Sequence, residues 1–144
     1  MILQKSREER AAVIIVDVEA PLIVSGLRGE GRRTVDAGNT AEALGSGDVP
    51  VLGTPAVLAV IEEAAVNAIR RQVPEGGTSV GVWVELEHLA PSKIGAEVVA
   101  TAVLTAVEGR LLHFDCEVHD GGTLVARAKH RRYLVIRDRW LAKA

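Results

Sequence analysis

The sequence is poor in aromatic side chains and in cysteine. Its 144 residues include two Trp, one Tyr, one Phe and one Cys. A surface on which nucleic-acid bases stack and a wide aromatic pocket are therefore excluded, and the core must consist of Ala, Val, Leu and Ile. Cys116 cannot form a disulfide within the chain and has no cysteine partners for a zinc site. We therefore expect a reducing compartment and no bound metal.

Long hydrophobic runs are also missing. The run Ala11–Val16 ends at Asp17 and is far shorter than the ~18 apolar residues of a membrane span. The first ten residues carry both acidic and basic side chains, and no signal-peptide pattern follows them. A formal net charge of −2 disfavours nucleic acid, which requires a basic surface. We expect a cytoplasmic protein with neither a membrane nor a nucleic-acid partner.

Charge is unevenly distributed along the chain. Within residues 126–144, Asp138 is the one acidic residue among seven basic ones. These basic residues are Arg127, Lys129, Arg131, Arg132, Arg137, Arg139 and Lys143. Two interpretations remain open, a solvated terminal strand or a binding surface for an anionic ligand such as a cofactor phosphate.

The chain length predicts one domain with a substantial core. Residues 1–25 are interpreted as an N-terminal extension, with a possible strand at Val13–Val18, and residues 26–144 as a single domain. Six glycines between residues 26 and 50 indicate loops around a short strand and a helical turn near Asn39–Leu44.

One long helix is predicted over Ala56–Gln72, which contains neither glycine nor proline. Thr54 is expected to cap it, and Pro55 suits its first position. Alternating segments then predict an antiparallel meander of four strands, at Thr78–Leu89, Gly95–Val107, Arg110–His119 and Thr123–Arg137. The expected class is α+β, with a curved antiparallel sheet wrapped around a central helix in the hotdog arrangement. Its edge strands suggest a homodimer.

Two polar residues fall on faces predicted to be apolar. Glu62 lies in line with Leu58 and Val66 on the helix. The two-residue period of a strand places His88 on the same face as four aliphatic residues, Val80, Val82, Val84 and Leu86. A carboxylate that faces a core costs several kcal/mol unless it is paired or protonated. Glu62 and His88 are therefore either functional groups or anchors of a buried hydrogen-bond network.

The same residues carry a resemblance to the fluoroacetyl-CoA thioesterase-like family of hotdog proteins. The similar stretches are Gly45–Glu62, Thr78–Val82, His88–Pro91 with Gly95, Glu108–Arg110 with Phe114, and the last strand with His130 and Arg132. Together they span about residues 26–140. The resemblance implies an acyl-CoA thioesterase that needs no cofactor beyond the CoA of its substrate.

The family's functional residues fall on definite positions of this sequence. The resemblance implies that Thr54, Glu62 and His88 are catalytic, that Gly81 contacts the thioester end of the ligand, and that Arg132 contacts the acyl-CoA. It leaves open whether Glu62 is a nucleophile or a general base. The family's fluoroacetyl-specific enzyme has phenylalanines in the lid over its acyl pocket, whereas the equivalent region, 39–52, contains no aromatic residue. This difference argues against fluoroacetyl-CoA as the substrate.

Two other functions remain as alternatives. In a non-catalytic module that binds CoA or an acyl group, Thr54, Glu62 and His88 would form a structural polar network. A hotdog hydratase would require an Asp/His pair, and Asp48 has no histidine near it in the sequence.

Overall fold

A computed structural model describes residues 23–144 of the chain. Its elements, in order, are β1 (Arg28–Thr34), α2 (Ala41–Leu44), α3 (Thr54–Ile69), β2 (Gly77–His88), β3 (Glu97–Glu108), β4 (Leu111–Asp120), β5 (Thr123–Ile136) and α4 (Arg137–Leu141). The predicted strand at Val13–Val18 and most of the predicted extension, residues 1–25, lie outside the described residues.

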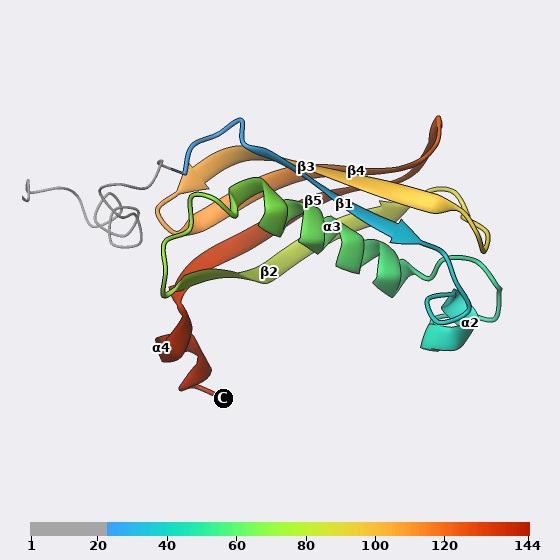
Figure 1. Ribbon diagram of the computed structural model, residues 1–144, viewed down its shortest axis with the longest axis horizontal. Coiled ribbons are helices and arrows are strands. Elements are labelled where there is room, and N and C mark those ends of the chain that lie inside the picture. Colours follow the sequence, from blue (N-terminus) through green and yellow to red (C-terminus); the bar gives the residue numbers. More distant parts are fainter. Residues whose placement is uncertain (1–22) are drawn as a thin grey trace, which may run out of the picture.

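The five strands form one antiparallel sheet in the order β1-β3-β4-β5-β2. The sheet curls over α3, and α4 projects away from it after the end of β5 (Figure 1). This α+β arrangement is the predicted one. The predicted meander is wrong in its first step, because β2 is not the neighbour of β3 but pairs with β5. Instead, the segment between them crosses the sheet to β3, which lies between β1 and β4. Within this segment, the carbonyl of Ser92 accepts from the backbone N–H of Leu52 at 2.9 Å.

Small aliphatic side chains fill the core, as the shortage of aromatics requires. Phe114 on β4 is the one aromatic residue of the buried cluster within residues 23–144. From α3, the buried side chains include Val57, Val60, Ile61 and Ala64, all fully shielded from solvent. This helix packs mainly against β1 and β3 and only lightly against β2. The flank of α3 nearest β2 is therefore less covered than the flank nearest β1.

The close approach of α3 to β1 depends on two glycines, Gly29 and Gly31. A Cβ added at Gly29 would collide with the backbone of Ala64 and Ala68, and a Cβ at Gly31 would lie 2.8 Å from the carbonyl oxygen of Val60. Backbone atoms cannot rotate away as side chains do, so the helix itself would have to shift.

We expect Gly29→Ala to destabilise the fold by about 2–4 kcal/mol, because overpacking against backbone is costlier than against flexible side chains. Gly122→Ala serves as the control, since a Cβ there has no neighbour within 4 Å. Chemical denaturation of both variants measures the difference. Equal midpoints for both variants would contradict the expectation.

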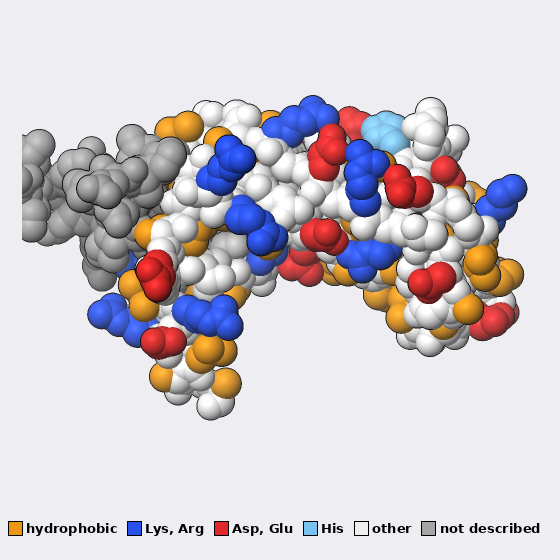
Figure 2. Space-filling model, in the orientation of Figure 1, with side chains coloured by type: hydrophobic (Ala, Val, Ile, Leu, Met, Phe, Trp, Pro, Cys, Tyr) orange, Lys and Arg blue, Asp and Glu red, His pale blue; other side chains and the backbone are white. Residues whose placement is uncertain are grey.

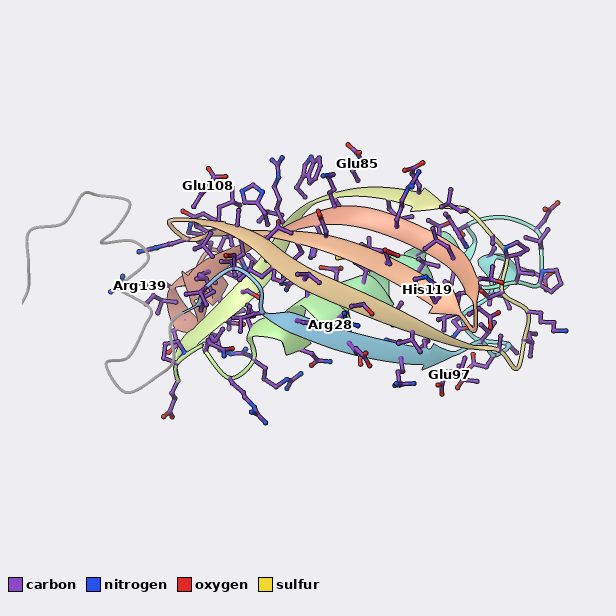
Figure 3. The ribbon with its side chains drawn as sticks, turned by 90° about the horizontal axis from the view of Figure 1, so that it is seen from above. Arg28, Glu85, Glu97, Glu108, His119 and Arg139 are labelled. Carbon is purple, nitrogen blue, oxygen red and sulfur yellow. The ribbon has the colours of Figure 1, made fainter. Side chains whose placement is uncertain are left out.

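Both edges of the sheet are open within the described chain. Figure 3, which views the sheet from outside, shows Arg28 on β1 and Glu85 on β2 at opposite edges. At the β2 edge, Val82 is 50% and Leu89 48% exposed. An open strand with exposed apolar residues is a surface for pairing with another strand.

Candidate active site

The first half of the candidate site joins the start of α3 to the end of β2. Thr54 Oγ1 and His88 Nδ1 lie 2.9 Å apart, within hydrogen-bond distance. The other ring nitrogen of His88, Nε2, is buried and has no hydrogen-bond partner among the described residues. The pair therefore leaves one buried imidazole nitrogen without a partner among the described residues.

The hydroxyl of Thr54 is free to reach His88 because it does not cap the helix. The predicted cap was wrong: Gly53 is the N-cap, Thr54 is the first residue of α3, and no side-chain hydrogen bond from the described residues caps this end. The helix also ends at Ile69 rather than at the predicted Gln72. A threonine at the first helical position projects outward from the N-terminal end. At this position the hydroxyl forms a hydrogen bond with His88 instead of with the backbone N–H groups of the first helical turn.

His88 is held in its neutral form by its surroundings. Burial lowers the pKa of this imidazole below its ordinary value, although the backbone of Ala90 acts in the opposite sense. Desolvation has this effect because it penalises the charged imidazolium. A neutral imidazole can accept a proton, which is the property that a general base requires.

The second half of the site is an ion pair between α3 and β5. Arg132 Nη1 donates to Glu62 Oε2 at 3.1 Å. The side chain of Arg132 is 7% exposed, whereas that of Glu62 is 40% exposed. The predicted placement of Glu62 toward the core is therefore wrong. It stands on the flank of α3 near β2, where its neighbours Leu58 and Val66 are half-buried.

Gly81 makes room for this carboxylate on β2. A Cβ at this position would collide with Glu62 Oε2 and would lie 3.2 Å from His130 Cε1 and 3.3 Å from Arg132 Nη1. No larger residue fits here without displacing Glu62. A glycine therefore lets the strand backbone lie directly against the carboxylate.

A bulge in β2 changes which residues face the helix. The register between β2 and β5 shifts between Gly81 and Trp83. Val84 and Leu86 share the inward face with His88, but Val80 and Val82, which the two-residue period also assigned to that face, do not. The extra residue of a bulge reverses the side-chain alternation beyond it. Trp83 lies on the outer face with the guanidinium of Arg131 4.1 Å from its ring centre.

The two halves of the site lie apart within one chain. Thr54 and Glu62 are eight residues apart on α3, which is about 12 Å along the helix axis. Among residues 23–144, no hydrogen bond joins Glu62 to Thr54 or to His88. The structure thus pairs Thr54 with His88, and groups Glu62 with Arg132 and Gly81, without bringing the two groups into contact.

Two polar residues of the second half were not identified as site residues from the sequence. Ser79 accepts from Arg132 twice, through Oγ at 2.9 Å and through its carbonyl oxygen at 3.1 Å. His130 is 2% exposed, and its Nε2 lies 3.2 Å from Arg132 Nη1. His130 could have been found from the two-residue period of the strand, which places it on the same inward face of β5 as Ala128 and Arg132. Ser79 has no comparable signal.

The basic residues of the C-terminal segment do not form one surface. Arg132 points inward, whereas Arg127 and Lys129 on the outer face pair with Glu87 and Asp115. Basic and acidic side chains also alternate on the face of the molecule shown in Figure 2. Arg132 is engaged by Ser79, Glu62 and His130. The hydrogen-bond partners of Arg132 are therefore protein groups, among them the Glu62 carboxylate, in place of the phosphate of a cofactor.

Two further features bear on the possible ligands. Within residues 23–144, no three His, Cys, Asp or Glu side chains are arranged to hold a metal ion. None of the helices in this part of the chain is long and apolar enough to cross a membrane.

Comparisons with known proteins identify relatives of this chain. The profile of a family described as fluoroacetyl-CoA-specific thioesterase matches residues 35–138. The fluoroacetyl-CoA thioesterase of Streptantibioticus cattleyicolor is 30% identical over 93 residues, which cover 65% of this chain and 67% of that protein.

Solved structures show the same fold. A solved structure of the fluoroacetyl-CoA thioesterase FlK superimposes with a TM-score of 0.79 at 26% identity, covering 85% of this chain and 96% of that one. A hot-dog-like protein from Thermanaerovibrio acidaminovorans gives a TM-score of 0.74 at 26% identity, covering 83% of this chain and 88% of that one. The chain has the hotdog fold and belongs to the fluoroacetyl-CoA-specific thioesterase family, a family of acyl-CoA thioester hydrolases.

Proposed function

We propose that this protein hydrolyses the thioester of a small acyl-CoA, with Thr54, Glu62 and His88 as its catalytic residues. The observation that carries the proposal is the Glu62 carboxylate, which Arg132 orients at 3.1 Å beside the side-chain-free backbone of Gly81. The buried guanidinium holds the carboxylate in one orientation, and its partial exposure lets a ligand reach it. Membership of a thioesterase family supplies the reaction type.

Glu62 can act in either of two ways. As a nucleophile, its carboxylate oxygen attacks the thioester carbonyl, the C–S bond breaks with departure of the CoA thiolate, and water then hydrolyses the mixed anhydride. As a general base, it removes a proton from the water that attacks the same carbonyl. Both routes release the free acid and the thiol of CoA.

Thr54, His88 and Gly81 are assigned supporting roles at the reacting carbonyl. The Thr54 hydroxyl, bonded to His88 at 2.9 Å, lies at the N-terminal end of α3, where the helix dipole favours developing negative charge. The neutral imidazole of His88 can exchange a proton with the Thr54 hydroxyl through Nδ1. Gly81 leaves its backbone accessible to the thioester oxygen.

A homodimer would join the two halves of the site. The β2 edge is open, and Val82 and Leu89 are exposed on it. Two β2 strands that pair antiparallel about a two-fold axis near their middle bring the Gly81 end of one protomer to the His88 end of its partner. Glu62 would then face the Thr54–His88 pair of the partner subunit. The separation of about 12 Å within one chain favours this arrangement over a site built from one chain.

We propose that the substrate is a small acyl-CoA and that the enzyme is not specific for fluoroacetyl-CoA. One solved FlK relative holds fluoroacetate and CoA, but residues 39–52 of this chain supply no aromatic side chain to a lid over the acyl group. The proposal includes a cytoplasmic location and no cofactor beyond the CoA of the substrate.

Release of the CoA thiol tests the proposal. We expect the protein to hydrolyse at least one member of a panel of acetyl-, medium-chain and arylacetyl-CoA, with turnover proportional to enzyme concentration. Thermal stabilisation by CoA without thiol release from any of the thioesters would instead favour a non-catalytic binding module.

A further inference from the structure

The buried imidazole of His130 has a definite protonation state. Its Nδ1 lies 2.9 Å from the backbone carbonyl oxygen of Trp83, and its Nε2 lies 3.2 Å from Arg132 Nη1. A carbonyl oxygen can only accept a hydrogen bond, and a guanidinium can only donate. Nδ1 therefore carries the proton, and Nε2 accepts from Arg132.

The groups that face His130 come from every strand and helix packed around it. Arg132 lies on its own strand, Trp83 offers a carbonyl from β2, Glu62 approaches from α3, and the ring of Phe114 on β4 lies 6.2 Å away between ring centres. Burial lowers the pKa of His130, and the charge of Arg132 adds to this effect, while the Trp83 carbonyl and Glu62 oppose it. The ring is thus kept in the neutral form that can accept from a cation.

Arg132 connects His130 to the carboxylate. The same nitrogen, Nη1, donates to His130 Nε2 and to Glu62 Oε2, while Nε and Nη2 are fixed by Ser79. Because the guanidinium is rigid and planar, the bond to His130, together with the two bonds to Ser79, holds the second hydrogen of Nη1 in one direction. That second hydrogen points to Glu62.

We propose that His130 is a positioning residue: it accepts one hydrogen bond from Arg132 Nη1 and thereby aims the other at Glu62. The proposal rests on the proposed role of Glu62 in thioester hydrolysis. Within residues 23–144, His130 makes no hydrogen bond to Glu62 and contacts Arg132 instead, so its effect on the carboxylate passes through the guanidinium. The bulge in β2 is part of the same arrangement, because the Trp83 carbonyl that fixes the imidazole lies at the shifted register.

Two variants separate the hydrogen bonds of His130. In His130→Gln, the side-chain oxygen occupies the position of Nε2 and can still accept from Arg132. In His130→Asn, the shorter amide can still donate to Trp83 but does not reach Arg132. We expect His130→Asn to lower kcat by about 10- to 100-fold with KM changed less than threefold, as for loss of a bond to a charged group. His130→Gln should retain most of the activity.

A second measurement does not depend on turnover. In wild type and His130→Gln, the Arg132 Nη signals in ¹⁵N NMR should be resolved by hindered rotation of the guanidinium, and in His130→Asn they should merge. Thermal unfolding identifies any variant that fails to fold.

The outcomes are distinct. Equal kcat and equal Arg132 signals in the two variants, whether both wild-type or both impaired, would overturn the positioning role. If the wild-type protein releases no thiol, the proposed function fails, and the Arg132 signals alone still decide whether His130 holds the guanidinium.

Discussion

Glu62→Gln is expected to lower the rate of thiol release from the best acyl-CoA substrate by at least about 100-fold. The amide has nearly the same shape as the carboxylate and can still accept from Arg132 Nη1, which lies 3.1 Å from Glu62 Oε2. What it loses is the negative charge needed to attack a carbonyl or to remove a proton from water. Because Glu62 is 40% exposed, the fold should tolerate the change. Steady-state kinetics with free-thiol detection measures the loss.

Glu63→Gln is the matched control. Glu63 is the next residue of α3, and its carboxylate pairs with Arg33 Nη2 on β1 at 2.6 Å, on the other flank of the helix. This substitution removes the same charge from the same helix but away from Gly81 and Arg132, so kcat/KM should stay within about twofold of wild type. Near-wild-type activity in Glu62→Gln, or an equal loss in both variants, would remove Glu62 from the mechanism.

The two roles of Glu62 differ in what accumulates on the protein. A nucleophilic carboxylate forms a mixed anhydride, which adds the mass of the acyl group to the protein during turnover. Rapid acid quenching followed by mass spectrometry detects this adduct on the peptide that contains Glu62. A general base leaves no adduct at any time.

Much of the fold is predictable from the sequence because its signals are local. The glycine- and proline-free segment after Pro55 gives α3, and the turn at Gly121–Gly122 separates β4 from β5. Strand order is a different matter. The pairing of β2 with β5 rather than β3 depends on where the chain crosses between residues 88 and 97, and no residue pattern specifies that crossing.

The site was harder to predict than the fold because it depends on departures from regular periods. The bulge near Val82 separates the faces of Val80 and Val84, which a strict two-residue period joins. On the helix, the 3.6-residue period correctly placed Glu62 on the same face as Leu58 and Val66. Its exposure follows instead from the lighter packing of α3 against β2, which is a tertiary property.

Mixing two inactive variants should restore activity if the site is shared between protomers. We expect Glu62→Gln and His88→Ala each to be nearly inactive alone. After co-refolding at equal amounts, half of the dimers contain one chain of each kind, and each such dimer has one intact site. The restored activity should therefore reach about a quarter of the wild-type value. Thiol release before and after co-refolding measures it.

The control mixes two variants from the same half of the site. His88→Ala and Thr54→Val both damage the pair that is joined by the 2.9 Å contact, so every site in their mixed dimers carries a defect and no activity should return. If Glu62 instead acted with Thr54 and His88 of its own chain, the first mixture would also stay inactive, because neither chain would hold a complete set. Recovery in the first mixture alone would mean that the separation of about 12 Å along α3 is bridged by the partner subunit and not by movement within one chain.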